Sequence, residues 1–280
     1  DTRNIIRRNF QWMTTLTFSH NTQMVEDIGT EDFVSTYNDP KGYMMYGYVE
    51  GYPLNSLWGF QYGGVWHNYQ EIEDNQVSRQ FVDYYSENKP GRPRYVDQNH
   101  DGVLNTEDLV YLGNADPILY GGFQNNFNIF GVNLSLYLTY SLGGKIYNYS
   151  EFYMAGTYCT NQYSYMKDGW HPLRNPDSDI PAPGCSGSSM LPSNFMVHDA
   201  SYLRLKNISV SYPIDLRKAS KKRLKTLTLG FNIDNVYLWT PYNGFDPDVS
   251  TSSDTSTIRR ADVGAYPQSR KYIFSATLNF

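Results

Sequence analysis

The sequence predicts an all-β fold, a transmembrane antiparallel β-barrel with short turns on one side and long loops on the other. Three observations predict it. Of the 280 residues, 16% are aromatic, with 26 Tyr, 14 Phe and 5 Trp, and this composition favours strands over a helical bundle. Segments of about ten residues alternate apolar with polar side chains, as barrel strands do. The links between these segments are long on one side and short on the other.

Period-two alternation predicts about seven strands. Residues 10–20 alternate Phe, Trp and Leu with Gln, Thr and Ser, and residues 57–66 alternate Trp, Phe and Tyr with Leu, Gly and Gln. Residues 119–131 and 132–141 alternate most regularly and meet at Gly131, which predicts a hairpin. Further strands are expected at residues 202–212, 225–237 and 271–280.

The links alternate in length along the chain. The long links are residues 67–118, 148–200 and 240–268. The short ones are the turn at Gly131 and residues 213–224, and a short helix is expected near residues 77–85. The apolar strand faces are aliphatic in the middle and aromatic towards the ends, which is typical of an outer-membrane barrel with a polar lumen. A soluble β-sandwich also alternates, so a secreted carbohydrate-binding or adhesion module with a calcium-stabilised loop is the alternative.

Composition excludes other classes of protein. The net charge is −5 and basic residues are scattered, so nucleic-acid binding has little support. The one basic cluster comprises Lys218, Lys221, Lys222, Arg223 and Lys225. No run approaches about 18 apolar residues, so we expect no transmembrane helix. Cys159 and Cys185 can pair in an oxidising compartment, although their spacing does not decide it. The polar sequence after Asp1 is not a signal peptide, so we expect a mature chain or part of a longer one.

Residues 97–108, DQNHDGVLNTED, have the spacing of an EF-hand or dockerin-like calcium loop. Oxygen-bearing side chains fall at positions 1, 3, 5, 9 and 12, Gly102 takes the sharp turn, and position 7 offers a carbonyl oxygen. We expect calcium to be held by Asp97, Asn99, Asp101, Val103, Asn105 and Asp108. The alternative is a polar turn that binds nothing, but three carboxylates this close repel one another without a cation.

No catalytic constellation is evident, and we expect no enzyme activity. The histidines do not have the paired spacing of metal ligands. Neither a G-x-S-x-G elbow nor a Ser–His–Asp set is visible.

Five ordered segments carry more specific motifs. They are EGYP at 50–53 with LWGFQYGGVW at 57–66, the calcium loop with LGNADP at 112–117, YLRLKNI at 202–208, YNGFDPD at 242–248 and YPQSR at 266–270. Together they resemble the SusC-like TonB-dependent transporters of Bacteroidetes outer membranes. Nothing matches the TonB box, the plug or the earlier strands of that family, and its plugged barrels have about 22 strands. The resemblance therefore implies the C-terminal part of such a barrel.

The resemblance also implies active nutrient import through the bacterial outer membrane. A SusD-like lipoprotein lid is expected to capture glycans or oligopeptides on the long extracellular loops. The TonB complex would act through the plug, and the short turns would be periplasmic. The other expected partners are the remaining N-terminal barrel and plug of the same transporter and the lipid bilayer.

Aromatic side chains of the long loops are expected to stack on sugars or pack against peptide side chains. The candidate ligand-binding residues are Trp66, Tyr158, Tyr163, Trp170 and Tyr242. The alternative for each is that the ring only packs the loops together.

Overall fold

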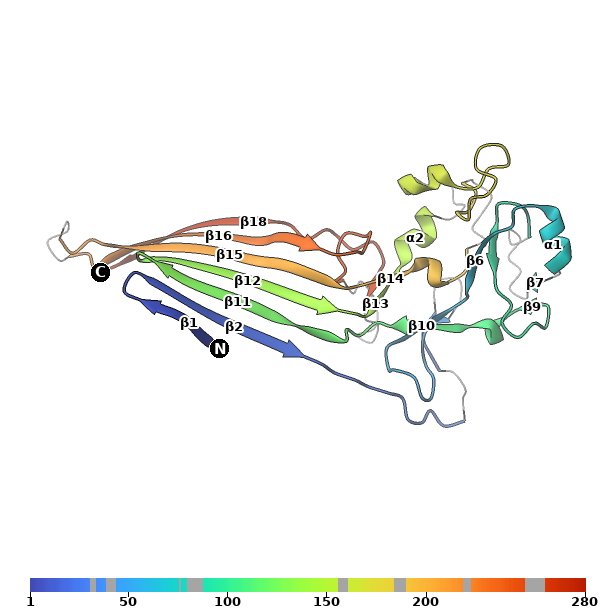
Figure 1. Ribbon diagram of the computed structural model, residues 1–280, viewed down its shortest axis with the longest axis horizontal. Helices are drawn as coiled ribbons and strands as arrows, with labels where there is room; N and C mark the ends of the chain where they lie inside the picture. Colours follow the sequence, from blue (N-terminus) through green and yellow to red (C-terminus); the bar gives the residue numbers. More distant parts are fainter. Residues whose placement is uncertain are drawn as a thin grey trace.

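The computed structural model describes residues 1–30, 34–38, 44–75, 77–79, 88–155, 161–183, 190–218, 223–249 and 260–280. Within these ranges, a long antiparallel sheet forms one end of the molecule and the long links gather at the other end (Figure 1). We call that second part the loop lobe; it comprises the described residues of 20–118, 143–201 and 240–270. None of the described helices has both the length and the apolar character needed to cross a membrane.

The sheet has seven strands in the order β1-β2-β11-β12-β15-β16-β18, each antiparallel to its neighbours. The strands are β1 (Thr2–Arg7), β2 (Phe10–Ser19), β11 (Leu119–Ile129), β12 (Val132–Leu142), β15 (Tyr202–Asp215), β16 (Thr226–Trp239) and β18 (Lys271–Asn279). The prediction of a mostly antiparallel β protein is confirmed, and six of the seven segments expected to be strands lie in this sheet. In the described part of the chain no second sheet packs on this one, so the two-layer arrangement of the alternative β-sandwich is not present (Figure 1).

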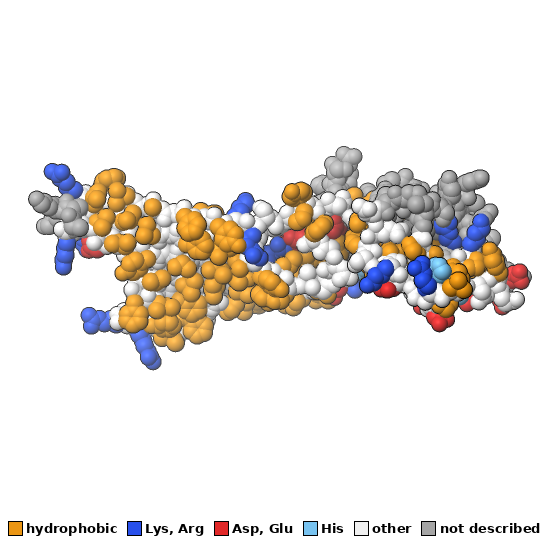
Figure 2. All heavy atoms as spheres, turned by 90° about the horizontal axis from the view of Figure 1, so that it is seen from above, with side chains coloured by type: hydrophobic (Ala, Val, Ile, Leu, Met, Phe, Trp, Pro, Cys, Tyr) orange, Lys and Arg blue, Asp and Glu red, His pale blue; other side chains and the backbone are white. Residues whose placement is uncertain are grey.

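The register gives the sheet one apolar and one polar face. One row of paired residues across six strands is Trp12, Phe127, Leu134, Val210, Phe231 and Phe274. A neighbouring row on the other face is Met13, Asn126, Ser135, Ser209, Asn232 and Ile273, which is polar in the four central strands. The apolar side chains are accessible: Phe18 is 72% exposed and Phe274 is 80% exposed. Figure 2 shows hydrophobic side chains spread over the sheet end of the molecule, and a patch of this extent marks contact with lipid or protein.

The predicted short links both lie at the far end of the sheet, which we call the turn end. Phe130 and Gly131 join β11 to β12 with φ angles of 51° and 87°, the left-handed pair that a two-residue hairpin requires. Residues 216–225 join β15 to β16. Lys and Arg side chains gather at this tip (Figure 2), although Lys221 and Lys222 lie outside the described residues.

The three long links all lie at the opposite end, as the sequence predicts (Figure 1). The first contains β3 (Val34–Asn38), β4 (Met44–Tyr48), β5 (Ser56–Gly59), β6 (Tyr62–Val65), α1 (Tyr69–Asn75), β7 (Ser78–Arg79), β8 (Pro93–Tyr95), β9 (Val103–Leu104), η1 (Thr106–Asp108) and β10 (Val110–Asn114). The second contains β13 (Lys145–Asn148), α2 (Tyr149–Met154), η2 (Ser164–Asp168), η3 (Asn194–Met196) and β14 (Val197–Asp199), and the third contains β17 (Ala261–Asp262).

Two details differ from the sequence-based expectations. The first long link runs from residue 20 to residue 118, because residues 57–66 form β5 and β6 inside the loop lobe rather than part of the long sheet. All four residues of β5 are buried, so its alternation reflects packing on both sides. The helix expected near 77–85 is α1 at residues 69–75 instead; residues 78–79 are strand, and 80–85 lie outside the described residues.

The hydrophobic core lies in the loop lobe. Its largest cluster of buried side chains is Tyr46, Leu57, Ala115, Tyr147, Tyr149, Phe152, Met190, Met196 and Ala261, drawn from all three long links. The three long links therefore pack into one unit with its own core, and the sheet extends from this unit.

Candidate functional site at the mouth of the sheet

A buried ion pair fastens the third long link to the sheet. Arg204 of β15 lies 2.5 Å from Asp246, and the two side chains are only 6% and 3% exposed. Arg204 also donates to Gln268 Oε1 at 3.3 Å, and Asp246 accepts the backbone N–H of Asp248 at 2.9 Å. Buried charges need such pairing to offset their lost hydration. The motifs YLRLKNI, YNGFDPD and YPQSR are thus joined at one point.

A second polar network lies inside the lobe. The buried carboxylate of Glu151 contacts His198 and accepts a hydrogen bond from the Tyr165 hydroxyl at 2.9 Å. The Tyr242 hydroxyl donates to buried Asp262 at 2.6 Å. Burial raises the pKa of the Tyr165 and Tyr242 hydroxyls well above the ordinary value of 10.0, and the adjacent carboxylates raise it further. Both tyrosines therefore stay protonated donors at neutral pH.

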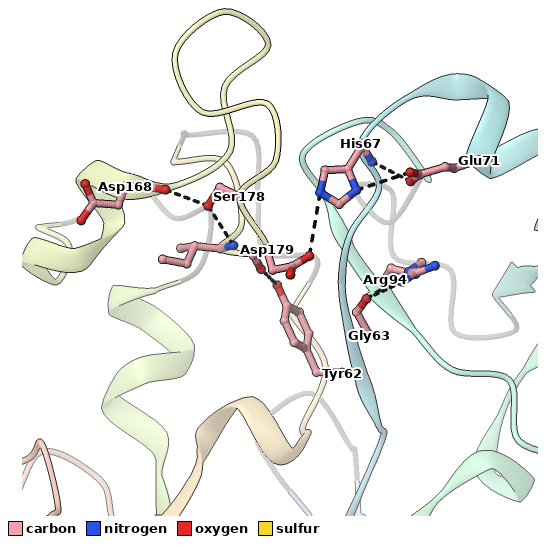
Figure 3. Close-up of polar contacts among 9 residues, drawn as sticks. Tyr62, Gly63, His67, Glu71, Arg94, Asp168, Ser178 and Asp179 are labelled. Atoms are coloured by element: carbon pink, nitrogen blue, oxygen red, sulfur yellow. Dashed lines mark hydrogen bonds and ion pairs between the residues drawn. The ribbon is translucent and has the colours of Figure 1, made fainter.

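A third set of contacts joins the first long link to the second (Figure 3). The Tyr62 hydroxyl donates to the Asp179 carbonyl at 2.5 Å, and His67 lies between Glu71 and Asp179 at 3.4 and 3.8 Å. Gly64 has φ +91°, and a Cβ there would lie 2.3 Å from Asp179 Oδ1. The positive φ favours glycine here, and any other residue would also displace the Asp179 carboxylate.

The predicted calcium loop folds through hydrogen bonds from its own backbone. Asp97 accepts the N–H groups of His100 and Gly102, both at 2.8 Å. Asp108 is fully buried and accepts the N–H groups of Gln98 at 2.7 Å and Asn105 at 2.8 Å. The two ends of the loop are therefore closed on each other, with Gly102 at φ +80° in the sharp turn.

The other polar side chains of the loop lie close to one another but do not surround a common centre. The Asn99 amide donates to Asp101 at 3.2 Å and to Glu107 at 3.1 Å. Among the described residues, no group of three or more His, Cys, Asp and Glu is arranged to hold a metal ion. Three of the six predicted ligands are the Asn99 and Asn105 amides and the Val103 carbonyl. A group made only of His, Cys, Asp and Glu does not include them. Residues 97–108 thus form a hydrogen-bonded loop with the oxygen-bearing side chains at the expected positions, and calcium binding stays a prediction.

The predicted ligand-binding aromatics lie in different surroundings. Trp66 and Tyr242 are buried, with 3% and 4% of their surfaces exposed. Trp170 is half-buried against Gly91, and Tyr163 stacks on Tyr165 at 5.6 Å. Tyr158 lies outside the described residues, as do Cys159 and Cys185. The structure does not bring these aromatics together into one surface, and their role in ligand binding stays a prediction.

Sequence reasoning missed a hollow between the loop lobe and the polar face of the sheet. It has a volume of about 460 Å³. Its lining comes from residues near positions 21, 116–121, 139–141, 202, 248–249 and 260, which are far apart in the sequence. No local motif marks such a site, so only the folded arrangement reveals it.

Comparison of the sequence with known proteins finds similarity to TonB-dependent receptors. No family model matches the chain. A TonB-dependent receptor of Formosa agariphila is 27% identical over 288 aligned positions, which cover 100% of this chain and 28% of that receptor. The TonB-dependent receptor SusC of Bacteroides thetaiotaomicron is 25% identical over 204 positions, which cover 70% of this chain and 18% of SusC. The predicted resemblance to SusC-like TonB-dependent receptors is confirmed.

The fold is also similar to solved structures. The RagAB peptide transporter superposes with a TM-score of 0.73 at 18% identity, covering 99% of this chain and 28% of the matched chain. The open-open state of the RagAB peptide importer gives a TM-score of 0.69 at 19% identity, covering 99% of this chain and 27% of the matched chain. The chain therefore spans little more than a quarter of the length of the SusC-like receptors that it matches end to end.

Proposed function

We propose that the chain is a wall segment of an outer-membrane TonB-dependent nutrient importer, together with the loops above it. The observation that carries this proposal is the seven-stranded sheet with an exposed apolar face, a polar opposite face and all long links at one end. A bilayer is the solvent in which such a face is stable, because lipid covers the apolar side chains and a closed barrel satisfies the backbone groups of all its strands internally. The similarity to TonB-dependent receptors supports the same assignment.

In this proposal the polar face lines the lumen, and the remaining strands and plug of the complete receptor close the barrel. The loop lobe is then extracellular and the turn end periplasmic. The polar contacts described above fix the three links against one another, so that the lobe presents a defined surface. A SusD-like lipoprotein would dock there and deliver glycans or oligopeptides, and the TonB complex would act through the plug.

Import is tested on the complete receptor expressed with and without functional TonB. We expect it to need detergent for extraction, to migrate differently in SDS gels before and after heating, and to take up its nutrient only when TonB is functional. Extraction without detergent, or uptake that does not depend on TonB, would contradict the proposed function.

We also propose that residues 97–108 bind calcium for a structural purpose. The support is the closed fold of the loop, its buried Asp108 and the oxygen donors at the required spacing. A bound cation would offset the repulsion between Asp97, Asp101 and Asp108 and draw the Asn99 side chain inward. Calcium would then stabilise the first long link and take no direct part in transport.

A further inference from the structure

The hollow of about 460 Å³ lies where the polar face of the sheet meets the loop lobe. Tyr120, Ser141 and Tyr202 pair across β11, β12 and β15, on the same face as the polar row. Asp116, Asp248 and Arg260 reach the hollow from the first and third long links. It therefore lies between the loop lobe and the polar face of the sheet, and several separate segments of the chain line it.

Arg260 is a fixed cation in this hollow. Its guanidinium donates to Ser141 Oγ at 2.7 Å and to the Gly143 carbonyl at 3.2 Å, and its own carbonyl accepts the N–H of Tyr147 at 3.0 Å. Its φ is +59°, a left-handed conformation that is uncommon for Arg. A Cβ at Gly144 would lie 2.5 Å from its Nη1. The backbone therefore directs this side chain, and the two side-chain hydrogen bonds to other described residues use two of its five N–H donors.

Two carboxylates flank the guanidinium. Asp248 is exposed and accepts a hydrogen bond from the Tyr202 hydroxyl. Asp116 accepts one from the Asn55 amide at 2.7 Å. Both interact with Arg260 electrostatically, as do Tyr202 and Asp199. The hollow thus presents one positive and two negative centres at separate positions, beside the exposed ring of Tyr120.

We propose that this hollow binds a zwitterionic ligand group, with its carboxylate on Arg260 and its ammonium on Asp248 and Asp116. Amino acids and short peptides carry both charges, whereas neutral glycans carry neither. Charge-assisted hydrogen bonds of this kind are about twice as strong as neutral ones, so the pocket discriminates between the two classes. The inference rests on the proposed import function and narrows its substrate class to peptides.

The test uses the complete receptor, solubilised and incubated with three probes. They are a casein digest, the same digest with its amino and carboxyl ends blocked, and the neutral oligosaccharide maltoheptaose. Bound material is identified by mass spectrometry, and affinity is measured by titration calorimetry. We expect the free digest to bind, and end-blocking to weaken binding about ten-fold, the effect of losing roughly one charge-assisted hydrogen bond.

Asp248→Asn is the informative variant because the side chain is exposed and Asn keeps an acceptor for Tyr202. We expect it to weaken binding of the free digest about ten-fold while a matched change at exposed Asp177, Asp177→Asn, has no effect. Unaltered heat-modifiable migration shows that both variants fold.

Digest binding that is insensitive to both end-blocking and Asp248→Asn would overturn the site and leave import standing. Binding of maltoheptaose alone would do the same. A receptor that binds none of the three probes and shows no TonB-dependent uptake would overturn both the site and the proposed function.

Discussion

Several side chains in the loop lobe, and Arg204 next to it, form polar contacts that are buried away from water. Arg204 and Asp246 bury opposite charges together, and Tyr242 gives its hydroxyl to buried Asp262. Removing one partner from such a contact leaves the other desolvated and unpaired, which costs more than the contact itself contributes. The lobe should therefore respond strongly to conservative changes at these positions.

Asp246→Asn should loosen the third long link from β15. Loss of one partner from a buried ion pair costs about 3–5 kcal/mol, and Arg204 would stay buried with only neutral acceptors, Gln268 and the new amide, among the partners described above. The measurement is hydrogen exchange of residues 240–249 in the complete receptor, where we expect faster exchange. Asp215→Asn is the matched control, because its pair with Arg217 is largely exposed and such pairs contribute little. Equal exchange in the two variants would refute the anchoring role.

Alkaline pH should destabilise the lobe. The pKa of Tyr62, Tyr165 and Tyr242 is raised above 10.0 in the folded state, mainly by burial. Above about pH 10 the unfolded chain loses these protons while the folded chain keeps them, so stability falls as pH rises. We expect the lobe's thermal midpoint to be flat in pH below this range and to drop above it. Tyr242→Phe should reduce the slope, and an unchanged slope would count against burial of this hydroxyl.

Calcium should raise the thermal stability of the first long link. Asp101→Ala removes a predicted ligand, so we expect it to lower that stability and to abolish its dependence on calcium. Calorimetry with and without chelator is the measurement, and Asp177→Ala is a control outside the loop. If chelator has no effect on the unmutated protein, residues 97–108 form only a hydrogen-bonded turn.

At the scale of elements, a glycine lies at a close contact between the first and second long links. Gly64→Ala would place a Cβ 2.3 Å from Asp179 Oδ1, whereas Gly51, at φ +81°, has nothing within 4 Å of its Cβ position. Both substitutions strain the backbone by about 1 kcal/mol, but only the first also displaces the Asp179 side chain and so disturbs the contact between the two links. We expect Gly64→Ala to increase cleavage of residues 161–183 by limited proteolysis, and Gly51→Ala to leave it unchanged.

The long strands were predictable because alternation has the same cause along their whole length, with one face apolar and the other polar. The 57–66 segment misled for the opposite reason, since Leu57 and Trp58 are both buried in the lobe. Strand β1 escaped prediction because Ile5 and Ile6 are adjacent, next to an irregularity in its pairing with β2. The sequence thus predicts strands with two unlike faces and fails where a strand is buried on both.

The candidate site was less predictable than the fold. The turn geometry at Asp97 and Gly102 follows from local spacing, and the structure has it. The hollow at Arg260 depends on three links and three strands that meet only after folding, so no short pattern indicates it. Aromatic content suggests ligand contacts at Trp66 and Tyr242, and these stay a prediction. That both rings are buried depends on residues distant in the sequence, so no local pattern indicates it.

At the scale of the whole molecule, the chain has two parts with different stabilising surroundings. The loop lobe carries the hydrophobic core, while the sheet exposes an apolar face and has edge strands β1 and β18. Unpaired edges and bare apolar faces favour aggregation in water. In the proposed receptor, neighbouring strands would pair with the edges and lipid would cover the face, which would remove both causes of aggregation.

The central claim is that lipid covers the apolar face of the sheet. Its most direct test is fluorescence quenching of single bimane-labelled cysteines by nitroxide lipids in the complete receptor, with Cys159 and Cys185 replaced by Ser. Phe231→Cys and Asn232→Cys are adjacent on β16 but lie on opposite faces. We predict strong quenching at residue 231 and little at residue 232. Equal quenching at the two positions, or stronger quenching at residue 232, would contradict the account.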